Sequence, residues 1–371
     1  MKKFYQKKWF KIIGLLLLVI FSVGGFLAWK TNKTFKKIST GSLFNDILHT
    51  LPVVKNELKG EKEGRINILL LGMRGEHVTG GGLLADTIMV LSIKPQEKKV
   101  AMVSIPRDLY VTIPGTNTQS KINAVYFYGE KKKQGGGIED MKKIVSEITG
   151  QPIHYGIAIN FKGFSQLVDA LGGVPLHLDK PFVEPLQFHE KHVCDKKVFT
   201  IPSGDFEEKK NKKGKVVAKY PLCYNSYEEC GGVFRLPKGD LNLNGEQALC
   251  YVRSRVTSND FERARRQQQI IQKIKEKALS TGTLSDFSKI NAILKALGDN
   301  VRTDMQIWEL KKLYKIYQEI GDNVNIKHKV LENSPEGLLY APQNTRPDQG
   351  YILLPRGDNY DKIKEMFKNI I

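Results

Sequence analysis

The chain lacks the motifs that identify several common protein classes. It has no GxxxxGKS or GxxxxGKT pattern, so the glycine-rich loop from Gly72 to Gly82 is not a Walker-type nucleotide site. It has no helix-turn-helix, zinc-finger or aromatic RNA-binding motif, and it has no internal repeats. These absences exclude a P-loop enzyme and leave no recognisable module for reading nucleic acid.

Acidic residues are scarce relative to basic ones. The chain has 39 Asp and Glu against 58 Lys and Arg, which gives a formal net charge of +19. A surplus of this size favours an anionic partner: nucleic acid, anionic lipid or a phosphate-rich substrate. The charge alone does not choose among them. With 371 residues, 41% of them hydrophobic, the chain can form one large domain or two small ones.

One apolar run, residues 12–29, contains no charged residue and has the length of a short membrane-spanning helix. Lysines precede the run within residues 1–11, and Trp9 and Trp29 lie at its two ends, as is typical of membrane interfaces. No small-x-small cleavage site follows, so we interpret the run as an uncleaved signal anchor. We therefore predict a basic cytoplasmic tail at 1–11, one transmembrane helix at 12–29 and a polar stalk at 30–63. The remainder of the chain is expected outside the cytoplasmic membrane.

Cysteine is rare, and the four cysteines are Cys194, Cys223, Cys230 and Cys250. An even count in an exported domain permits disulfides. Cys223 and Cys230 flank a short polar loop, which predicts a disulfide between them. Cys194 and Cys250 are candidates for a second pair, and Cys250 is alternatively a buried free thiol. A zinc site that combines cysteines with nearby histidines is less favoured, because the CxxC spacing of structural zinc sites is missing.

Strand-like and helix-like patterns alternate along most of the chain. Strands are expected at residues 66–72, 86–93, 99–105, 153–160, 174–178 and 251–256. Helices are expected at residues 138–149, 161–171, 260–278, 284–297 and 304–320, and a short helix or turn at residues 243–249. The alternation predicts an α/β fold with a central, largely buried mixed sheet flanked by helices. We assign the folded domain to 64–331, with a cysteine-containing excursion at 182–236, and a C-terminal tail to 332–371 that ends in an amphipathic helix.

Arginines concentrate in one stretch that spans the last predicted strand and the start of the helix after it. Arg253 and Arg255 are two residues apart, so on a strand they point to the same face. Asp260, Arg263 and Gln267 follow at helical spacing and share one face of the next helix. A strand end and a helix would thus direct guanidinium groups to one place, which suits a phosphate or pyrophosphate. A surface salt-bridge network is the alternative, but the stretch has too few acids to neutralise its arginines.

A lone acid, Asp86, stands where the glycine-rich loop leads into an apolar strand. Burial of an acid is costly unless it binds something. A hard divalent ion such as Mg²⁺, held by one or two carboxylates and substrate phosphates, would explain it, and a capping or turn role is the alternative. Arg107 and Asp108 end the strand at 99–105, where ligands of α/β sheets gather. The pair marks a candidate ligand site, with a local salt bridge as the alternative.

Seven separated motifs occur in an order that resembles the LytR–CpsA–Psr family of cell-envelope enzymes. They read NILLLG, DTIMV, SIPRDLYVTIPG, KINAVYFYG, DALGGV, LNGEQALCYVRSR and DFERARRQQ. The resemblance covers Ile66 to about Lys275. It implies a phosphotransferase outside the cytoplasmic membrane. Such an enzyme takes a glycopolymer from an undecaprenyl-pyrophosphate carrier and attaches it to peptidoglycan through a phosphodiester.

The resemblance also implies roles for individual residues. Asp86 corresponds to a magnesium-associated aspartate, and Asp260 to the acid at the start of the last motif. The implied pyrophosphate-binding residues are Lys99, Arg107, Arg253, Arg255, Arg263 and Gln267. The implied catalytic residues are Asp86, Arg107, Arg253, Arg255 and Asp260. The expected cofactor is Mg²⁺.

Two positions depart from the family pattern. Arg74 stands where the family usually has an aspartate after its first strand, and Leu84 stands where it often has an arginine. One expected carboxylate and one expected arginine are therefore absent, and Arg74 is a candidate for the missing positive charge. The departures support a second hypothesis, a non-catalytic envelope protein that binds a polyprenyl pyrophosphate or a glycan. A transcriptional regulator is a third hypothesis, but the predicted export argues against a nucleic-acid partner.

Overall fold

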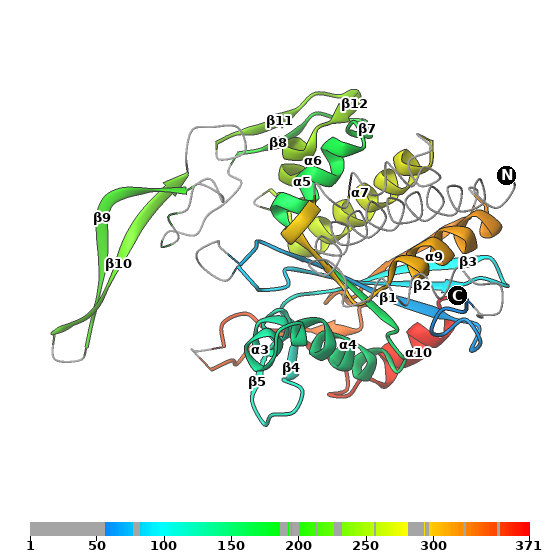
Figure 1. Ribbon diagram of the computed structural model, residues 1–371. Coiled ribbons are helices and arrows are strands. Elements are labelled where there is room, and N and C mark those ends of the chain that lie inside the picture. Colours follow the sequence, from blue (N-terminus) through cyan, green and yellow to red (C-terminus); the bar gives the residue numbers. More distant parts are fainter. Residues whose placement is uncertain are drawn as a thin grey trace, which may run out of the picture.

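Helices lie on both faces of one central β-sheet in the computed structural model, and a long hairpin projects from the body (Figure 1). The structure describes residues 56–76, 82–185, 192, 194, 200–211, 214–225, 232–255, 257–280, 293, 297–321, 324–346 and 349–371. The predicted transmembrane segment at 12–29, stalk residues 30–55 and most of the predicted helix at 284–297 lie outside these residues. Within them, every helix is too short or too polar to cross a membrane.

The central sheet has six strands in the order β13-β6-β1-β2-β3-β14. Their bounds are β1 (Ile66–Met73), β2 (Thr87–Lys94), β3 (Lys99–Ile105), β6 (Tyr155–Asn160), β13 (Val301–Thr303) and β14 (Ile326–Val330). The three central strands pair antiparallel, β6 runs parallel to β1, and β14 runs parallel to β3. β13 pairs antiparallel with β6. The predicted mixed sheet is therefore confirmed.

Within the described residues, five helices cover the two faces of this sheet. They are α3 (Val125–Lys132), α4 (Gly136–Thr149), α7 (Asp260–Ser280), α9 (Ile307–Ile320) and α10 (Asp361–Asn369). Side chains alternate along β1, so Ile66 and Ile68 pack on the face covered by α7 and α9, whereas Leu69 and Leu71 pack on the face covered by α3, α4 and α10. Both faces are thus buried, which explains the almost continuous apolar sequence of the central strands.

A second, smaller core lies beside the sheet (Figure 1). It is built from α5 (Phe161–Ala170), β7 (Val174–Leu178), β12 (Gly239–Leu243) and α6 (Gly245–Arg253), with β12 paired to β7.

The predicted strand at 251–256 is wrong, because its first residues belong to α6. A capping box starts this helix: the Gln247 backbone N–H donates to Asn244 Oδ1 (2.8 Å), and the Asn244 N–H donates to Gln247 Oε1 (3.2 Å). At the C-terminal end of the helix, the Ser254 hydroxyl donates to the Cys250 carbonyl (2.9 Å). The apolar run after the cap is therefore the buried face of a helix.

The C-terminal tail packs back onto the main core. Its Leu353 N–H donates to the Asp108 carbonyl, and the Tyr110 N–H donates to the Leu353 carbonyl, both at 2.9 Å. Ile363 and Phe367 of α10 are buried in the same core. The other short elements are β4 (Tyr110–Thr112), β5 (Gln119–Lys121), β15 (Leu339–Tyr340), β16 (Leu354–Pro355) and the 3₁₀ turns Ile122–Ala124 and Gly298–Asn300.

The excursion at 182–236 contains two antiparallel strand pairs. β8 (Phe182–Glu184) pairs with β11 (Phe234–Leu236) near the small core. β9 (Thr200–Lys210) and β10 (Val216–Asn225) form the hairpin that projects from the body in Figure 1. The predicted surface excursion is thus a structured hairpin over its described residues.

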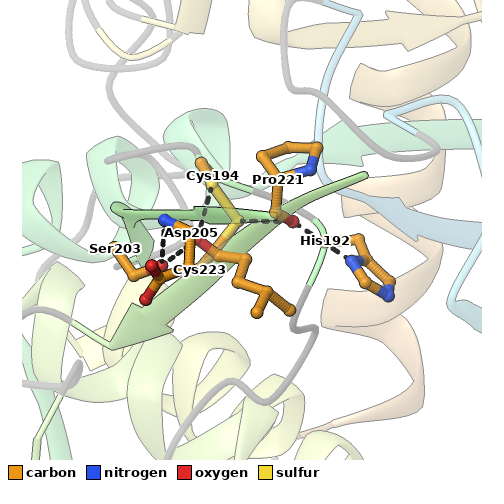
Figure 2. The surroundings of a disulfide bond; sticks show 7 residues. His192, Cys194, Ser203, Asp205, Pro221 and Cys223 are labelled. Carbon is orange, nitrogen blue, oxygen red and sulfur yellow. Dashed lines mark hydrogen bonds between the residues drawn. A yellow bond between two sulfur atoms is a disulfide. The ribbon is translucent and has the colours of Figure 1, made fainter. Parts of the chain in front are cut away.

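A disulfide joins Cys194 to Cys223, with Cα atoms 5.3 Å apart (Figure 2). The predicted Cys223–Cys230 disulfide is therefore wrong, and so is the Cys194–Cys250 alternative. Cys223 lies within β10, and its partner comes from a segment that the hairpin brings alongside, which nearness in sequence does not reveal. Cys250 is also disulfide-bonded, so it is not a free thiol. Cys194 and Cys223, which the alternative zinc site would need as thiolates, are thus oxidised.

Candidate functional site

Charged side chains from four parts of the chain converge at one edge of the central sheet. Arg74 follows β1, Asp86 precedes β2 and Arg107 follows β3. The antiparallel register pairs Gly72 with Thr87 and Ile88 with Ile105, so these three positions share the edge. The first turn of α7 adds Asp260 and Arg263. The site is therefore assembled by strand ends that lie far apart in the sequence.

Asp86 is a mostly buried carboxylate that faces two guanidinium groups. Arg107 Nη1 donates to Asp86 Oδ1 at 2.9 Å, and Arg74 Nε lies 3.9 Å from Asp86 Oδ2. Burial raises the pKa of Asp86, but Arg107, Arg263 and Arg74 together outweigh burial and bring the pKa below its ordinary value. Asp86 is therefore ionised at neutral pH.

Arg107 contacts three aspartates at once. Besides its hydrogen bond to Asp86, its Nε lies 3.3 Å from Asp260 Oδ2 and 3.5 Å from Asp108 Oδ2. Burial alone would lower the pKa of the Arg107 guanidinium, but the three carboxylates raise it above its ordinary value. On its other side, Asp108 accepts a hydrogen bond from Lys121 Nζ at 2.7 Å. Arg107 is thus a permanent cation held in a defined position.

The N-terminus of α7 brings two further arginines to Asp260. Arg263 Nη2 lies 3.4 Å from Asp260 Oδ2, and Arg255 Nη1 lies 3.5 Å from Asp260 Oδ1. Burial, together with the nearby Arg107, lowers the pKa of Arg263 to about 10, so it stays protonated at neutral pH. Arg255 is more accessible, with 40% of its side chain exposed. The first N–H groups of α7 are already capped, since the Phe261 and Glu262 N–H groups donate to Asn259 Oδ1 at 3.0 and 2.9 Å.

The cluster keeps an excess of positive charge. Five cations face three carboxylates: Arg74, Arg107, Lys121, Arg255 and Arg263 against Asp86, Asp108 and Asp260. The net charge of these eight side chains is therefore +2. A small cleft opens on this cluster and is lined by Asp86, Arg107, Asp260, Arg263 and Gln267, among others. Guanidinium donors around such a cleft suit the oxygens of a phosphate or pyrophosphate.

The model of the LytR_cpsA_psr family matches residues 30–368 of the sequence. The chain belongs to this family.

Relatives and solved structures agree with the family assignment. The chain is 27% identical over 362 residues to polyisoprenyl-teichoic acid–peptidoglycan teichoic acid transferase TagV of Bacillus subtilis (strain 168), covering 95% of this chain and 76% of that protein. It is 29% identical over 325 residues to the transferase TagU of Oceanobacillus iheyensis, covering 86% and 84%. The crystal structure of B. subtilis TagV superposes with a TM-score of 0.53 at 22% identity, covering 82% of this chain and 96% of that one. This structural likeness shows a shared fold.

Most of the site residues expected of a LytR_cpsA_psr protein lie in or beside the cluster. Asp86, Arg107, Asp260 and Arg263 line the cleft together with Gln267, whose Nε2 donates to the Val252 carbonyl at 3.3 Å. Arg255 lies in the loop between α6 and α7 and reaches Asp260.

Arg253 is placed differently from the expectation. It ends α6, so the two arginines of the motif do not share a strand face. Its guanidinium carbon lies 4.6 Å from the centre of the Phe161 ring, in a cation–π contact.

Lys99 lies outside the cluster. It begins β3, whereas Arg107 follows the other end of that strand. At about 3.3 Å per residue, the two ends of β3 are roughly 20 Å apart. Lys99 Nζ instead donates to Glu97 Oε2 at 2.7 Å on the surface. The structure therefore does not bring Lys99 to the pyrophosphate-binding residues that the resemblance implied.

Sequence reasoning missed one residue that positions the site. Gln268 is 3% exposed, and its Nε2 donates to Ser104 Oγ and to the Lys329 carbonyl, both at 2.9 Å. These bonds join α7 to β3 and β14 and so fix the helix that carries Arg263. The sequence gives only a weak signal for this role. Gln268 is the middle of three consecutive glutamines, so its polarity does not distinguish it from its exposed neighbour.

The cluster does not fit a resident magnesium ion. Among the residues that the structure describes, no group of three or more His, Cys, Asp or Glu side chains is arranged to hold a metal. Asp86 is one carboxylate between Arg107 and Arg74, and the second nearby acid, Asp260, faces three arginines. Mg²⁺ prefers oxygen ligands and is repelled by these cations. The predicted magnesium dependence therefore has no support in the donor set.

Proposed function

We propose that this chain is a phosphotransferase that moves an anionic glycopolymer from a polyisoprenyl-pyrophosphate carrier to peptidoglycan. The observation that carries the proposal is the cluster of arginines and aspartates around the cleft, in which five cations face three carboxylates. The names of the relatives support it, since TagV and TagU are polyisoprenyl-teichoic acid–peptidoglycan teichoic acid transferases. The glycopolymer is therefore of the teichoic acid class, a polyanion that a basic chain attracts.

The proposed reaction is a single displacement at phosphorus. An acceptor hydroxyl oxygen of peptidoglycan attacks the phosphorus that carries the glycopolymer. The new P–O bond forms as the bond to the bridging pyrophosphate oxygen breaks, and polyisoprenyl phosphate leaves with that bonding pair. The product is a phosphodiester between glycopolymer and peptidoglycan. Such transfers need positioning and charge stabilisation more than covalent help from the protein.

Each charged residue has a proposed part in this step. Arg107, Arg255 and Arg263 bind the pyrophosphate oxygens and stabilise the charge on the leaving phosphate. Asp86 holds Arg107 in place through the 2.9 Å hydrogen bond. Asp260 accepts the proton of the attacking hydroxyl, because its side chain is 29% exposed, compared with 18% for Asp86 and 9% for Asp108. The pKa of Asp260 lies below its ordinary value: burial raises it, but Arg263, Arg107 and Arg255 lower it more, so the carboxylate is ionised and ready to accept.

We further propose that residues 12–29 anchor the chain in the cytoplasmic membrane, with the N-terminus inside and the site outside. The support is the uncharged apolar run and its flanking lysines and tryptophans. Protease treatment of intact cells tests this orientation, since an exported domain is degraded and an internal one is protected.

The test of the function uses the full chain in detergent micelles with a polyisoprenyl-pyrophosphate-linked saccharide and peptidoglycan fragments. The expected result is equal release of polyisoprenyl phosphate and of phosphodiester-linked product, measured by mass spectrometry. Arg255→Ala should lower the turnover about tenfold or more, because one charge-stabilising donor is lost. Lys209→Ala on the distant hairpin is the matched control and should change nothing.

Two other outcomes would contradict the transferase. Full turnover by Arg255→Ala would show that the cluster takes no part in the reaction. Tight binding of the carrier lipid without release of polyisoprenyl phosphate would instead identify a non-catalytic carrier-binding protein, which is the second candidate because of the Arg74 and Leu84 departures.

A further inference from the structure

Arg74 lies buried at the edge of the cluster. It is only 9% exposed, and its Nε lies 3.9 Å from Asp86 Oδ2. The loop that follows is closed at its base, since the Gly75 N–H donates to the Gly82 carbonyl at 2.8 Å. Gly75 has φ of 128°, a conformation that favours glycine, so the chain turns sharply directly after Arg74. The main chain at Arg74 is therefore set by β1 on one side and by this turn on the other.

The two oxygens of Asp86 face two different guanidinium groups. Oδ1 accepts the hydrogen bond from Arg107 at 2.9 Å, and Oδ2 faces Arg74. A third arginine, Arg263, acts on the same carboxylate through space and lowers its pKa with the other two. One carboxylate with three cations around it is a poor donor set for a divalent ion, which needs several anionic oxygens.

We infer that Arg74 supplies the positive charge beside Asp86 that a bound divalent cation supplies in a metal-dependent phosphotransferase, so that this chain works without a metal. The inference rests on the proposed function. A guanidinium presents several N–H donors in a plane and remains charged at all physiological pH values. As the bond to the bridging oxygen breaks, negative charge moves to the leaving polyisoprenyl phosphate. Arg74 and Arg107, on the two sides of Asp86, stabilise that charge.

The first test measures turnover of the full chain in EDTA and in Mg²⁺. The wild-type rate should change less than about twofold between the two conditions, because no step needs the ion. Arg74→Ala should lose about 10²-fold in both conditions, since one charge-stabilising donor is missing. Arg74→Asp should be inactive in EDTA and regain turnover with Mg²⁺, since it places a second carboxylate next to Asp86. Thermal melting of each variant verifies that the fold is kept.

The second test needs no turnover. Binding of Mn²⁺, followed by the loss of its free electron paramagnetic resonance signal, should be weak for the wild type and about tenfold or more tighter for Arg74→Asp, because two carboxylates replace one. The double variant Arg74→Asp with Asp86→Asn is the control and should bind as weakly as the wild type. Lys99→Asp, which adds an acid far from the cluster, should not gain a site.

The inference is wrong if EDTA abolishes wild-type turnover and Mg²⁺ restores it, or if the wild type binds Mn²⁺ as tightly as Arg74→Asp. If no form of the chain turns over, the proposed function fails, and Mn²⁺ binding still decides whether Arg74 occupies the place of the ion.

Discussion

The two ends of β3 each carry a cation next to an acid, yet the two pairs differ in burial and surroundings. At the start of the strand, Lys99 pairs with Glu97, and their side chains are 52% and 46% exposed. Beyond the other end, Arg107 pairs with Asp86, and their side chains are 19% and 18% exposed. An exposed ion pair contributes about 0–1 kcal/mol and is screened by salt. The buried pair keeps its charges close and hard to screen.

The surroundings explain the difference. Lys99 follows a tight turn between β2 and β3. Arg107 lies beyond the other end of β3, where Asp86, which precedes β2, and Asp260 of α7 both reach it. A basic residue thus contributes to a site where several elements converge on it, and charge in the sequence alone does not identify such a place. Four measurements test this difference between the two ends of β3.

The largest effect is expected at Arg107. Arg107→Ala should lower kcat/KM by about 10²–10³, because it removes one charge-stabilising donor and leaves Asp86 without its hydrogen-bonded partner. Arg107→Lys keeps the charge but loses the planar donors, so it should recover only part of the rate. The measurement is release of polyisoprenyl phosphate at several substrate concentrations. Near-normal kcat/KM in a folded Arg107→Ala protein would remove this end of β3 from the site.

A smaller effect, on stability, is expected at Gln268, which joins α7 to the Arg107 end of β3. Gln268→Ala should lower the free energy of unfolding by about 1–3 kcal/mol, because buried partners at Ser104 and Lys329 lose their hydrogen bonds. Urea unfolding followed by circular dichroism measures it. Its neighbour Gln269 is exposed, so Gln269→Ala is the matched control and should cost less. Equal losses in the two variants would show that Gln268 does not fix the helix.

The pH dependence of the free energy of unfolding should differ between the charged pairs at the two ends of β3. The pKa of Asp86 lies below its ordinary value in the folded chain, so its ion pairs stabilise the fold above about pH 4 and are lost as the pH falls further. Asp86→Asn should therefore lower stability at neutral pH and flatten the decline below about pH 4. Urea unfolding at neutral and acidic pH measures this.

Glu97 provides the control for that experiment. Lys99 and Lys94 lower the pKa of Glu97 to about 2, but this group lies on the surface. The effect of Glu97→Gln should therefore disappear in high salt, whereas that of Asp86→Asn should persist. If salt removed both effects equally, the contrast between the two ends of the strand would be lost.

The smallest effect is expected at Lys99. Lys99→Ala should change turnover less than twofold and the free energy of unfolding by no more than about 0.5 kcal/mol, as is usual for an exposed position. The same turnover and urea assays apply. A large loss of turnover would mean that Lys99 acts on the substrate despite its distance from the cluster.

Local patterns in the sequence predicted most of the regular structure. The apolar runs at 66–73 and 99–105 became central strands, and the periodic segment before Gly150 became α4. The strand predicted at 251–256 was wrong because an apolar run can belong to either element. The capping box at Asn244 and Gln247 marks the start of this helix, whose first part was predicted as a short helix or turn at 243–249.

The sequence by itself determined the mixed α/β fold, the family and the presence of an arginine-rich site, because these depend on local propensity, apolar pattern and motif order. Only the tertiary structure decided which charges meet. It placed Arg74 beside Asp86, kept Lys99 away and paired Cys223 with Cys194. These contacts follow from strand register and from the packing of segments that lie far apart in the chain, and a local sequence pattern does not show which distant segments meet.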